Sequence, residues 1–162
     1  MLVFRIVLLV LVILCAVWLL LIMGRARHPG RVKMTGQLFA HRGLHSEPEA
    51  PENSREAFRR AAARGFGAEF DVHLLKDGGL AVMHDSALKR MTGCEGEIEN
   101  LTVEQLKDYT LGRSSETIPT FADVLQIFDG KTPLIIELKT RGRNAAPLCE
   151  AVCRVLDTYK GT

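Results

Sequence analysis

The fold is decided by the stretch from Gly67 to Asp85, which reads GAEFDVHLLKDGGLAVMHD. Its first half alternates polar and apolar residues, so Glu69, Asp71 and His73 are expected on one face of a strand. Two carboxylates two residues apart on a strand point the same way at roughly 7 Å, and their like charges disfavour each other. A hard divalent cation with oxygen ligands relieves that repulsion. A solvated strand face is the alternative for this motif taken alone.

The second half of the stretch predicts an antiparallel hairpin. The segment between Asp71 and His84 is too short for a crossover helix, and Asp77-Gly78 is a favoured hairpin turn. Pairing centred on the Asp77–Gly78 junction sets Asp71 opposite His84. The hairpin would therefore bring the His84-Asp85 dipeptide to the neighbourhood of the two carboxylates.

A second polar group follows the short apolar strand expected over residues 37–40. That strand ends in His41-Arg42-Gly43, which places a titratable ring and a fixed cation where the backbone turns sharply. The tripeptide is a candidate part of the same site, and a plain surface loop is the alternative.

The residues that precede the next helix have a structural explanation. Asn53 is a good N-cap, and Glu56 stands at N3 to complete a capping box. Gly65 is expected to end the helix. Glu52 and Asn53 are therefore explained as a cap, and a role in a site would require Glu52 to face it.

The later part of the chain predicts a strand of buried type over residues 133–139. Glu137 and Lys139 lie on one face of this strand. A carboxylate and an ammonium at the end of an apolar strand must pair or bind something. An ordinary surface pair at the strand end is the alternative.

Helices are expected over residues 103–109, 121–128 and 146–159. In the last helix Leu156 is expected to face inward, and Cys149 and Cys153 share one face, where cysteine commonly acts as a small buried hydrophobe. The whole order is strand, helix, strand, strand, helix, strand, helix, with polar residues at the strand ends. A parallel α/β barrel begins in this way.

The N-terminus is an apolar head, Ile6 to Met23, of about eighteen residues without a charge. A helix of that length reaches about 27 Å, which crosses a bilayer core of about 30 Å with some thinning. A cleaved signal peptide is the alternative, but its apolar core is usually shorter and ends in a small-x-small site, which LIMGRAR fits poorly. We therefore expect an uncleaved single-span membrane anchor over residues 1–24 and a juxtamembrane linker over residues 25–36.

Charge gives an expected orientation and argues against one class of partner. Arg5 precedes the apolar head, whereas four cations follow it, so the positive-inside tendency places the C-terminal part in the cytoplasm. The chain has 21 basic and 19 acidic residues. Because five of the basic residues flank the head, the remainder is mildly acidic, which argues against nucleic acid as a partner.

The ordered set of motifs resembles the glycerophosphodiester phosphodiesterases. The matching motifs are His41-Arg-Gly, Pro51-Glu-Asn-Ser54, Glu69-x-Asp-Val72, Lys76-Asp-Gly78, His84-Asp-x-x-Leu-x-Arg90 with Thr92-Gly93, and Ile136-Glu-Leu-Lys139. Each motif alone is weak, but order and spacing match from about Leu38 to Lys139. The resemblance implies an α/β fold of the (β/α)8 TIM-barrel type and hydrolysis of glycerophosphodiesters to glycerol 3-phosphate and an alcohol.

The resemblance also implies a metal site and a pair of catalytic histidines. Family members bind a divalent metal, Ca²⁺ or Mg²⁺, through acids that correspond here to Glu69, Asp71 and Glu137. The two motif histidines, His41 and His84, would act as base and acid. Imidazoles suit this task because they can take up and release a proton near neutral pH.

The resemblance further implies that Arg42 and Lys139 hold phosphate oxygens. Displacement at a phosphodiester builds negative charge, which a guanidinium meets bidentately and an ammonium as a point charge. Glu52 and Asn53 are further candidates for the site. His73 stands where relatives often have Gln; it either packs or binds substrate.

Length is the large departure from the family. A closed barrel takes about 250 residues, and the expected catalytic domain, residues 37–162, is near half of that. We therefore expect a truncated domain with about the first half of the barrel. Two other functions stay open: a phospholipase D-like enzyme acting on lipid, which the anchor favours, and an inactive half-barrel fragment.

Overall fold

The computed structural model describes residues 2–23 and 34–161, and the chain divides into two units at Thr35 and Gly36. In the first unit the apolar head forms one helix, α1 (Leu2–Ile22), with a mean hydropathy of 3.1 over its most apolar window. This helix is long and apolar enough to cross a membrane, and a signal sequence would meet the same criterion. The predicted linker lies largely outside the described residues.

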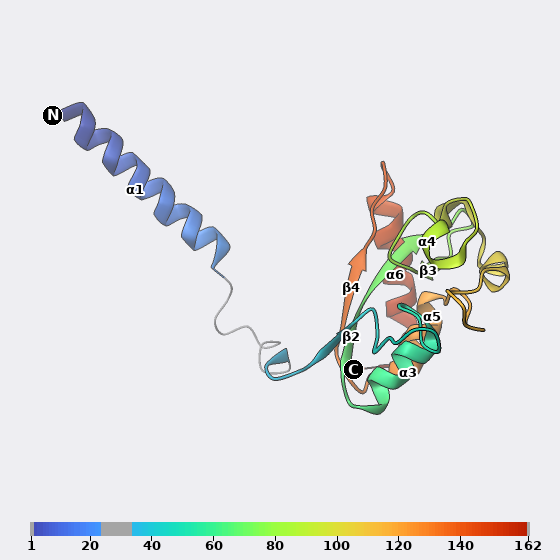
Figure 1. The fold of residues 1–162 in the computed structure, drawn as a ribbon. Coiled ribbons are helices and arrows are strands. Elements are labelled where there is room, and N and C mark those ends of the chain that lie inside the picture. The colour runs from blue at the N-terminus through green and yellow to red at the C-terminus, as the bar shows by residue number, and fades with distance from the viewer. Residues whose placement is uncertain (1, 24–33, 162) are drawn as a thin grey trace. The chain divides into compact units, whose positions relative to one another are not determined.

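The second unit is built on a mixed sheet with β2 at its centre (Figure 1). Strand β2 (Gly67–Leu74) pairs in parallel with β1 (Phe39–His41) and with β4 (Leu134–Leu138). Its second half also pairs with the antiparallel strand β3 (Leu80–Val82). The predicted strands and the hairpin are therefore confirmed.

Three helices cover one face of the sheet: α3 (Arg55–Ala63), α5 (Phe121–Phe128) and α6 (Ala145–Thr158). The alternation along β2 explains why they pack there, because Phe70 and Val72 point into this layer and are fully buried. Phe58 of α3 meets Phe70 edge to face, with ring centroids 5.4 Å apart. The acidic residues of β2 point to the opposite face.

The segment from residue 86 to 118 forms a second apolar cluster beside the hairpin. Its short elements are α4 (Lys89–Thr92) and the 3₁₀ helices η1 (Ile98–Asn100) and η2 (Val103–Asp108). Leu88, Ile98 and Leu111 are buried in this cluster together with Met83 from the hairpin. This second apolar cluster encloses the polar end of β2 on the side of the hairpin.

The register of the hairpin differs from the prediction by one residue. Val72 pairs with Val82, and the Met83 amide donates to the Asp71 carbonyl at 3.2 Å, so Asp71 lies opposite Met83 and not His84. The cause is the turn, since the Leu75 amide donates to the Gly79 carbonyl and leaves three residues in the loop, with Gly78 at φ 83°. A three-residue loop with a left-handed glycine is a common hairpin connection.

The predicted cap of α3 was wrong by one residue. Ser54, and not Asn53, is the N-cap, and its hydroxyl accepts from the Ala57 amide at 3.1 Å. Asn53 has φ 57°, a left-handed conformation that asparagine tolerates better than most residues. The predicted end of this helix at Gly65 (φ 69°) is confirmed, and Thr120 caps α5 because its side chain accepts from the Asp123 amide.

The outer edge of the sheet is less buried than predicted. Strand β4 is half-buried, with Ile135 42% exposed. On α6, Leu148 and Val152 face the core, whereas Leu156, which was expected to face inward, is 39% exposed. Cys149 and Cys153 are exposed too, so the prediction that they are buried hydrophobes was wrong. A strand that pairs on one edge only, as β4 does among the described strands, covers less of its neighbouring helix.

Candidate active site at the ends of the parallel strands

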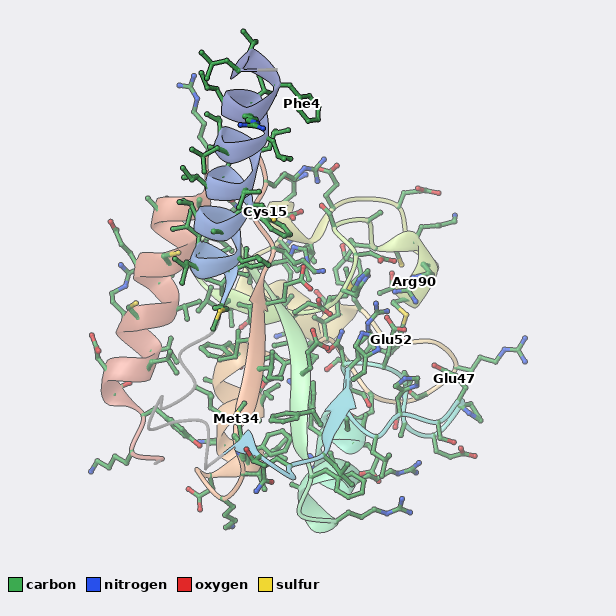
Figure 2. All side chains as sticks on the ribbon, turned by 90° about the vertical axis from the view of Figure 1, so that its left-hand side faces the viewer. Phe4, Cys15, Met34, Glu47, Glu52 and Arg90 are labelled. Carbon is green, nitrogen blue, oxygen red and sulfur yellow. The ribbon has the colours of Figure 1, made fainter. Side chains whose placement is uncertain are left out.

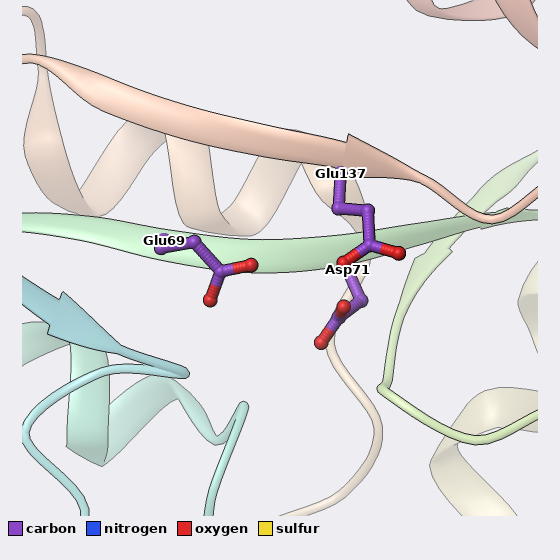
Figure 3. Close-up of side chains that lie close together, drawn as sticks. All are labelled: Glu69, Asp71 and Glu137. Atoms are coloured by element: carbon purple, nitrogen blue, oxygen red, sulfur yellow. The ribbon is translucent and has the colours of Figure 1, made fainter.

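Three carboxylates from two strands converge in the sheet (Figure 3). Asp71 of β2 and Glu137 of β4 are direct partners in the parallel ladder, and Glu69 lies two residues before Asp71 on the same face. Ligand oxygens of the three side chains all lie within 4.8 Å of one another. The alternation along β2 and its pairing with β4 thus place all three predicted metal ligands in one cluster.

The surroundings of this cluster suit a cation. Asp71 is 1% exposed, and its Oδ1 atom and the Oε2 atom of Glu69 are buried without a hydrogen-bond donor. Buried carboxylate oxygens of this kind carry a large desolvation cost unless a positive charge is close. Oxygen donors on two or three carboxylates are the ligands that Ca²⁺ and Mg²⁺ prefer. The residues present therefore fit such a metal.

Lys139 supplies positive charge to the same carboxylates. Its Nζ atom lies 2.7 Å from Glu137 Oε1 and 2.9 Å from Asp71 Oδ1, the second contact being an ion pair without hydrogen-bond angles. Partial burial disfavours the charged ammonium, but the two carboxylates outweigh it and raise the pKa of Lys139. A strand-end cation thus lies at the acidic cluster.

His41 and Arg42 lie beside the cluster because β1 pairs with β2. His41 is the ladder partner of Glu69, its Nε2 atom lies 3.7 Å from Glu69 Oε2, and its side chain is 68% exposed. Arg42 has φ 57° and Gly43 φ 82°, so the backbone turns sharply after the strand. A side chain added at Gly43 would lie 2.8 Å from the Ala57 methyl group. Left-handed backbone at a non-glycine residue is uncommon and is enriched at functional sites.

Glu52 and Asn53 both face the site. The Asn53 side-chain amide donates to Asp71 Oδ2 at 3.2 Å, and Asn53 is 1% exposed. Arg42 donates from Nη1 to Glu52 Oε1 at 3.0 Å, while its Nε atom lies 4.0 Å from Asp71 Oδ2. A role of Glu52 in the site required that it face the site, and its hydrogen bond with Arg42 meets this condition.

His84 is joined to this region through other side chains. Its Nδ1 atom lies 2.7 Å from Asp85 Oδ1, and Arg90 donates from Nε to Asp85 Oδ2 at 2.5 Å. Among the described residues, His84 makes no direct ion pair with the three carboxylates. The motif that contains Arg90 was recognised from the sequence, but the pairing of Arg90 with Asp85 was not predicted.

His73 is buried and is held away from a substrate role. It is 2% exposed, and its Nδ1 atom lies 2.9 Å from Glu99 Oε1. Glu99 in turn accepts from the Ser86 hydroxyl at 2.6 Å. Burial disfavours ionisation of Glu99, but these hydrogen bonds and the His73 charge lower the pKa of Glu99 overall. Of the two roles considered for His73, the structure favours packing.

The fold should become less stable as the pH falls from 3.8 to about 2, because Asp85 is then protonated. The hydrogen bond from Arg90, opposed by burial and aided by His84, lowers the pKa of Asp85 from 3.8 to about 2. A depressed carboxyl pKa stabilises the fold above the unfolded value, and this contribution is lost as the pH falls through the folded value. After allowance for solvent screening it is about 1 kcal/mol.

Urea unfolding of the chain in detergent micelles measures this contribution. Asp85→Asn should be about 1 kcal/mol less stable than the parent chain at about pH 6, and the difference should shrink towards about pH 2. An equal difference at both pH values would contradict the prediction. Asp157→Asn, on the exposed face of α6, is the control and should change little at either pH.

Functional side chains at the carboxyl ends of parallel strands are characteristic of α/β enzymes. The chain belongs to one family of them: the model of the glycerophosphoryl diester phosphodiesterase family matches residues 41–160. The family resemblance expected from the motifs is therefore confirmed.

Individual relatives agree with this family membership. A glycerophosphodiester phosphodiesterase of Caldanaerobacter subterraneus is 38% identical over 111 residues, which cover 64% of this chain and 45% of the relative. One of Bacillus altitudinis is 36% identical over 112 residues, covering 65% and 45% of the two chains.

Solved structures show the same fold. A phosphodiesterase of Oleispira antarctica in complex with the product sn-glycerol-3-phosphate is 30% identical, with a TM-score of 0.69 over 76% of this chain and 52% of that one. A glycerophosphodiester phosphodiesterase of Thermotoga maritima is 33% identical, with a TM-score of 0.64 over 76% and 50% of the two chains. The chain thus spans about half the length of the relatives it matches.

Proposed function

We propose that this chain carries the catalytic residues for metal-dependent hydrolysis of glycerophosphodiesters to glycerol 3-phosphate and an alcohol. The observation that carries the proposal is the convergence of Glu69, Asp71 and Glu137 beside His41 in a member of this family. The sn-glycerol-3-phosphate bound to the Oleispira antarctica phosphodiesterase supports the substrate class.

Glu69, Asp71 and Glu137 would hold a divalent cation, Ca²⁺ or Mg²⁺. When bound, the cation supplies positive charge to the phosphate oxygens. Arg42 and Lys139 add to it from the protein side. Arg42 keeps donors for a phosphate because Glu52 occupies only one nitrogen, Nη1. Lys139, with its Nζ atom between two carboxylates, acts as a point charge.

His41 and His84 would move the protons. One imidazole takes the proton of the attacking glycerol hydroxyl as its oxygen bonds to phosphorus, and the other protonates the leaving alkoxide as the phosphorus–oxygen bond breaks, which leaves a cyclic phosphate. Water then opens this cyclic phosphate to glycerol 3-phosphate, with the proton roles of the two imidazoles reversed. The exposed ring of His41 is accessible to substrate. The His84 ring has its Nδ1 atom on Asp85, which leaves Nε2 for the substrate side.

We propose for the whole architecture a (β/α)8 barrel of which about the first half is present here, preceded by a single membrane span. The parallel strands β1, β2 and β4 support it, with β3 as an antiparallel addition. The proposed parts are the anchor at 1–24, the linker at 25–36 and the catalytic domain at 37–162. The flanking charges support a cytoplasmic catalytic domain.

Incubation with glycerophosphocholine, with and without a chelator, tests the function. We expect glycerol 3-phosphate to be released in the presence of Ca²⁺ or Mg²⁺ and release to stop when the chelator is added. Release of the head-group alcohol from phospholipid vesicles, without release of glycerol 3-phosphate from glycerophosphocholine, would favour the lipid-directed alternative, which α1 makes relevant. If this chain is inactive while a full-length form is active, the hypothesis that this chain is an inactive half-barrel fragment is correct.

Glu69→Gln should weaken metal binding at least about tenfold, since even an outer partner of a metal ligand is typically worth 10- to 100-fold. The reason is the loss of one charged oxygen from the three-carboxylate cluster. Calorimetric titration with Ca²⁺ and Mg²⁺ measures it. Glu104→Gln is the matched control, because Glu104 is exposed and pairs with Lys107. Unchanged affinity in Glu69→Gln would exclude this residue as a ligand.

A further inference from the structure

Arg90 of α4 joins two carboxylates that come from distant parts of the chain. It donates from Nε to Asp85 Oδ2 at 2.5 Å and from Nη2 to Glu52 Oε1 at 2.6 Å. Figure 2 labels Arg90 and Glu52 on neighbouring segments, although they are 38 residues apart in sequence. A guanidinium can make both contacts at once because its donors diverge from one rigid plane.

The Asp85 side of this bridge orients the His84 ring. Arg90 occupies Oδ2 of Asp85, and the other oxygen, Oδ1, lies 2.7 Å from His84 Nδ1. An ionised carboxylate only accepts hydrogen bonds, so the proton of this contact is on Nδ1. With the proton on Nδ1, Nε2 is the ring nitrogen that can exchange a proton with substrate.

The Glu52 side of the bridge holds Arg42. A single oxygen, Glu52 Oε1, accepts from Arg90 Nη2 at 2.6 Å and from Arg42 Nη1 at 3.0 Å. Arg42 also lies with Nε 4.0 Å from Asp71 Oδ2. Hydrogen bonds and ion pairs therefore link the His84 imidazole through Asp85, Arg90, Glu52 and Arg42 to the buried carboxylate of Asp71.

We propose that Arg90 is a positioning residue: by holding Asp85 and Glu52 together, it fixes the His84 ring and the Arg42 guanidinium relative to each other. The function of those two groups rests on the proposed phosphodiesterase activity. Arg90 is itself 47% exposed, and exposed ion pairs contribute little to the stability of a fold. Its loss should therefore affect the site far more than the stability of the chain.

The test compares Arg90→Met with Lys89→Met in the full chain. Lys89 is the adjacent residue of α4 and makes an exposed ion pair with Glu95 at 2.7 Å, so it matches Arg90 in charge and location. Nitrogen NMR of ¹⁵N-histidine-labelled chain reports the protonated ring nitrogen of His84. His84→Gln identifies its signals among the 5 histidines.

We expect His84 in the parent chain and in Lys89→Met to be protonated at Nδ1, and Arg90→Met to shift it towards Nε2 protonation. In the same variant kcat/KM should fall about 10- to 100-fold, the usual loss on removing a partner that orients a functional side chain. His84 signals in Arg90→Met that match the parent chain would overturn the proposal.

Arg90→Lys separates charge from geometry. A lysine can reach one of the two carboxylates but not both, so we expect this variant to recover only part of the lost activity. Full activity in Arg90→Lys would show that charge alone suffices and would also overturn the positioning role. A parent chain without activity would count against turnover by this chain and not against the positioning role, since the NMR comparison needs no turnover.

Discussion

Asp71→Asn should lower kcat/KM for glycerophosphocholine by at least about 10³-fold, because the change removes a proposed metal ligand and the counter-charge of the two cations proposed to bind substrate. Asp71 is 1% exposed and lies 2.9 Å from Lys139 and 4.0 Å from Arg42. A neutral amide would leave both cations without their buried partner. Release of glycerol 3-phosphate at saturating metal measures the effect.

The Asp71→Asn result needs a folding control. Asparagine keeps the size of the side chain and its contact with Asn53, so the circular dichroism spectrum should match that of the parent chain. Asp157→Asn, on the exposed face of α6, should keep full activity. A folded Asp71→Asn chain with turnover within about tenfold of the parent would exclude Asp71 from the reaction.

His41→Ala should reduce kcat by about 10²- to 10⁴-fold, the range that general acid–base catalysis contributes, while metal affinity stays within about twofold. The two effects separate because the His41 ring lies 3.7 Å from Glu69 and is not among the three clustered carboxylates. Steady-state kinetics and calorimetric titration of the same sample measure them.

His45→Ala is the matched control for His41→Ala, because His45 is an exposed histidine of the same loop. We expect it to leave both turnover and metal affinity unchanged. Retained turnover in His41→Ala would remove its catalytic role. A lost metal site would instead make His41 a ligand.

The parts of the fold that follow from local patterns could be predicted from the sequence. Alternation along β2 placed Glu69 and Asp71 on one face, and the parallel pairing of β2 with β4 then sets Glu137 beside Asp71. Capping residues such as Thr120 mark helix starts through contacts within one turn. The alternation and the capping contacts depend on neighbours in sequence, so the sequence carries them directly, whereas the pairing of β2 with β4 joins segments far apart in the chain.

The parts that depend on tertiary contacts could not be predicted in this way. Asn53 looks like a cap, but the acceptor it meets, Asp71, is 18 residues away. The bridge from Arg90 to Glu52 spans 38 residues. A motif indicates that such residues matter, but only the folded arrangement shows which partner each one meets.

The turn between β2 and β3 fixes more than the path of the backbone. Met83 faces Asp71 across the ladder and is 1% exposed in the second apolar cluster, and His84 follows it. A slip of this register by one residue would turn Met83 out of the apolar cluster and turn His84 to the opposite face of the strand. Among natural sequences, the residues of this loop should therefore vary while its length is conserved.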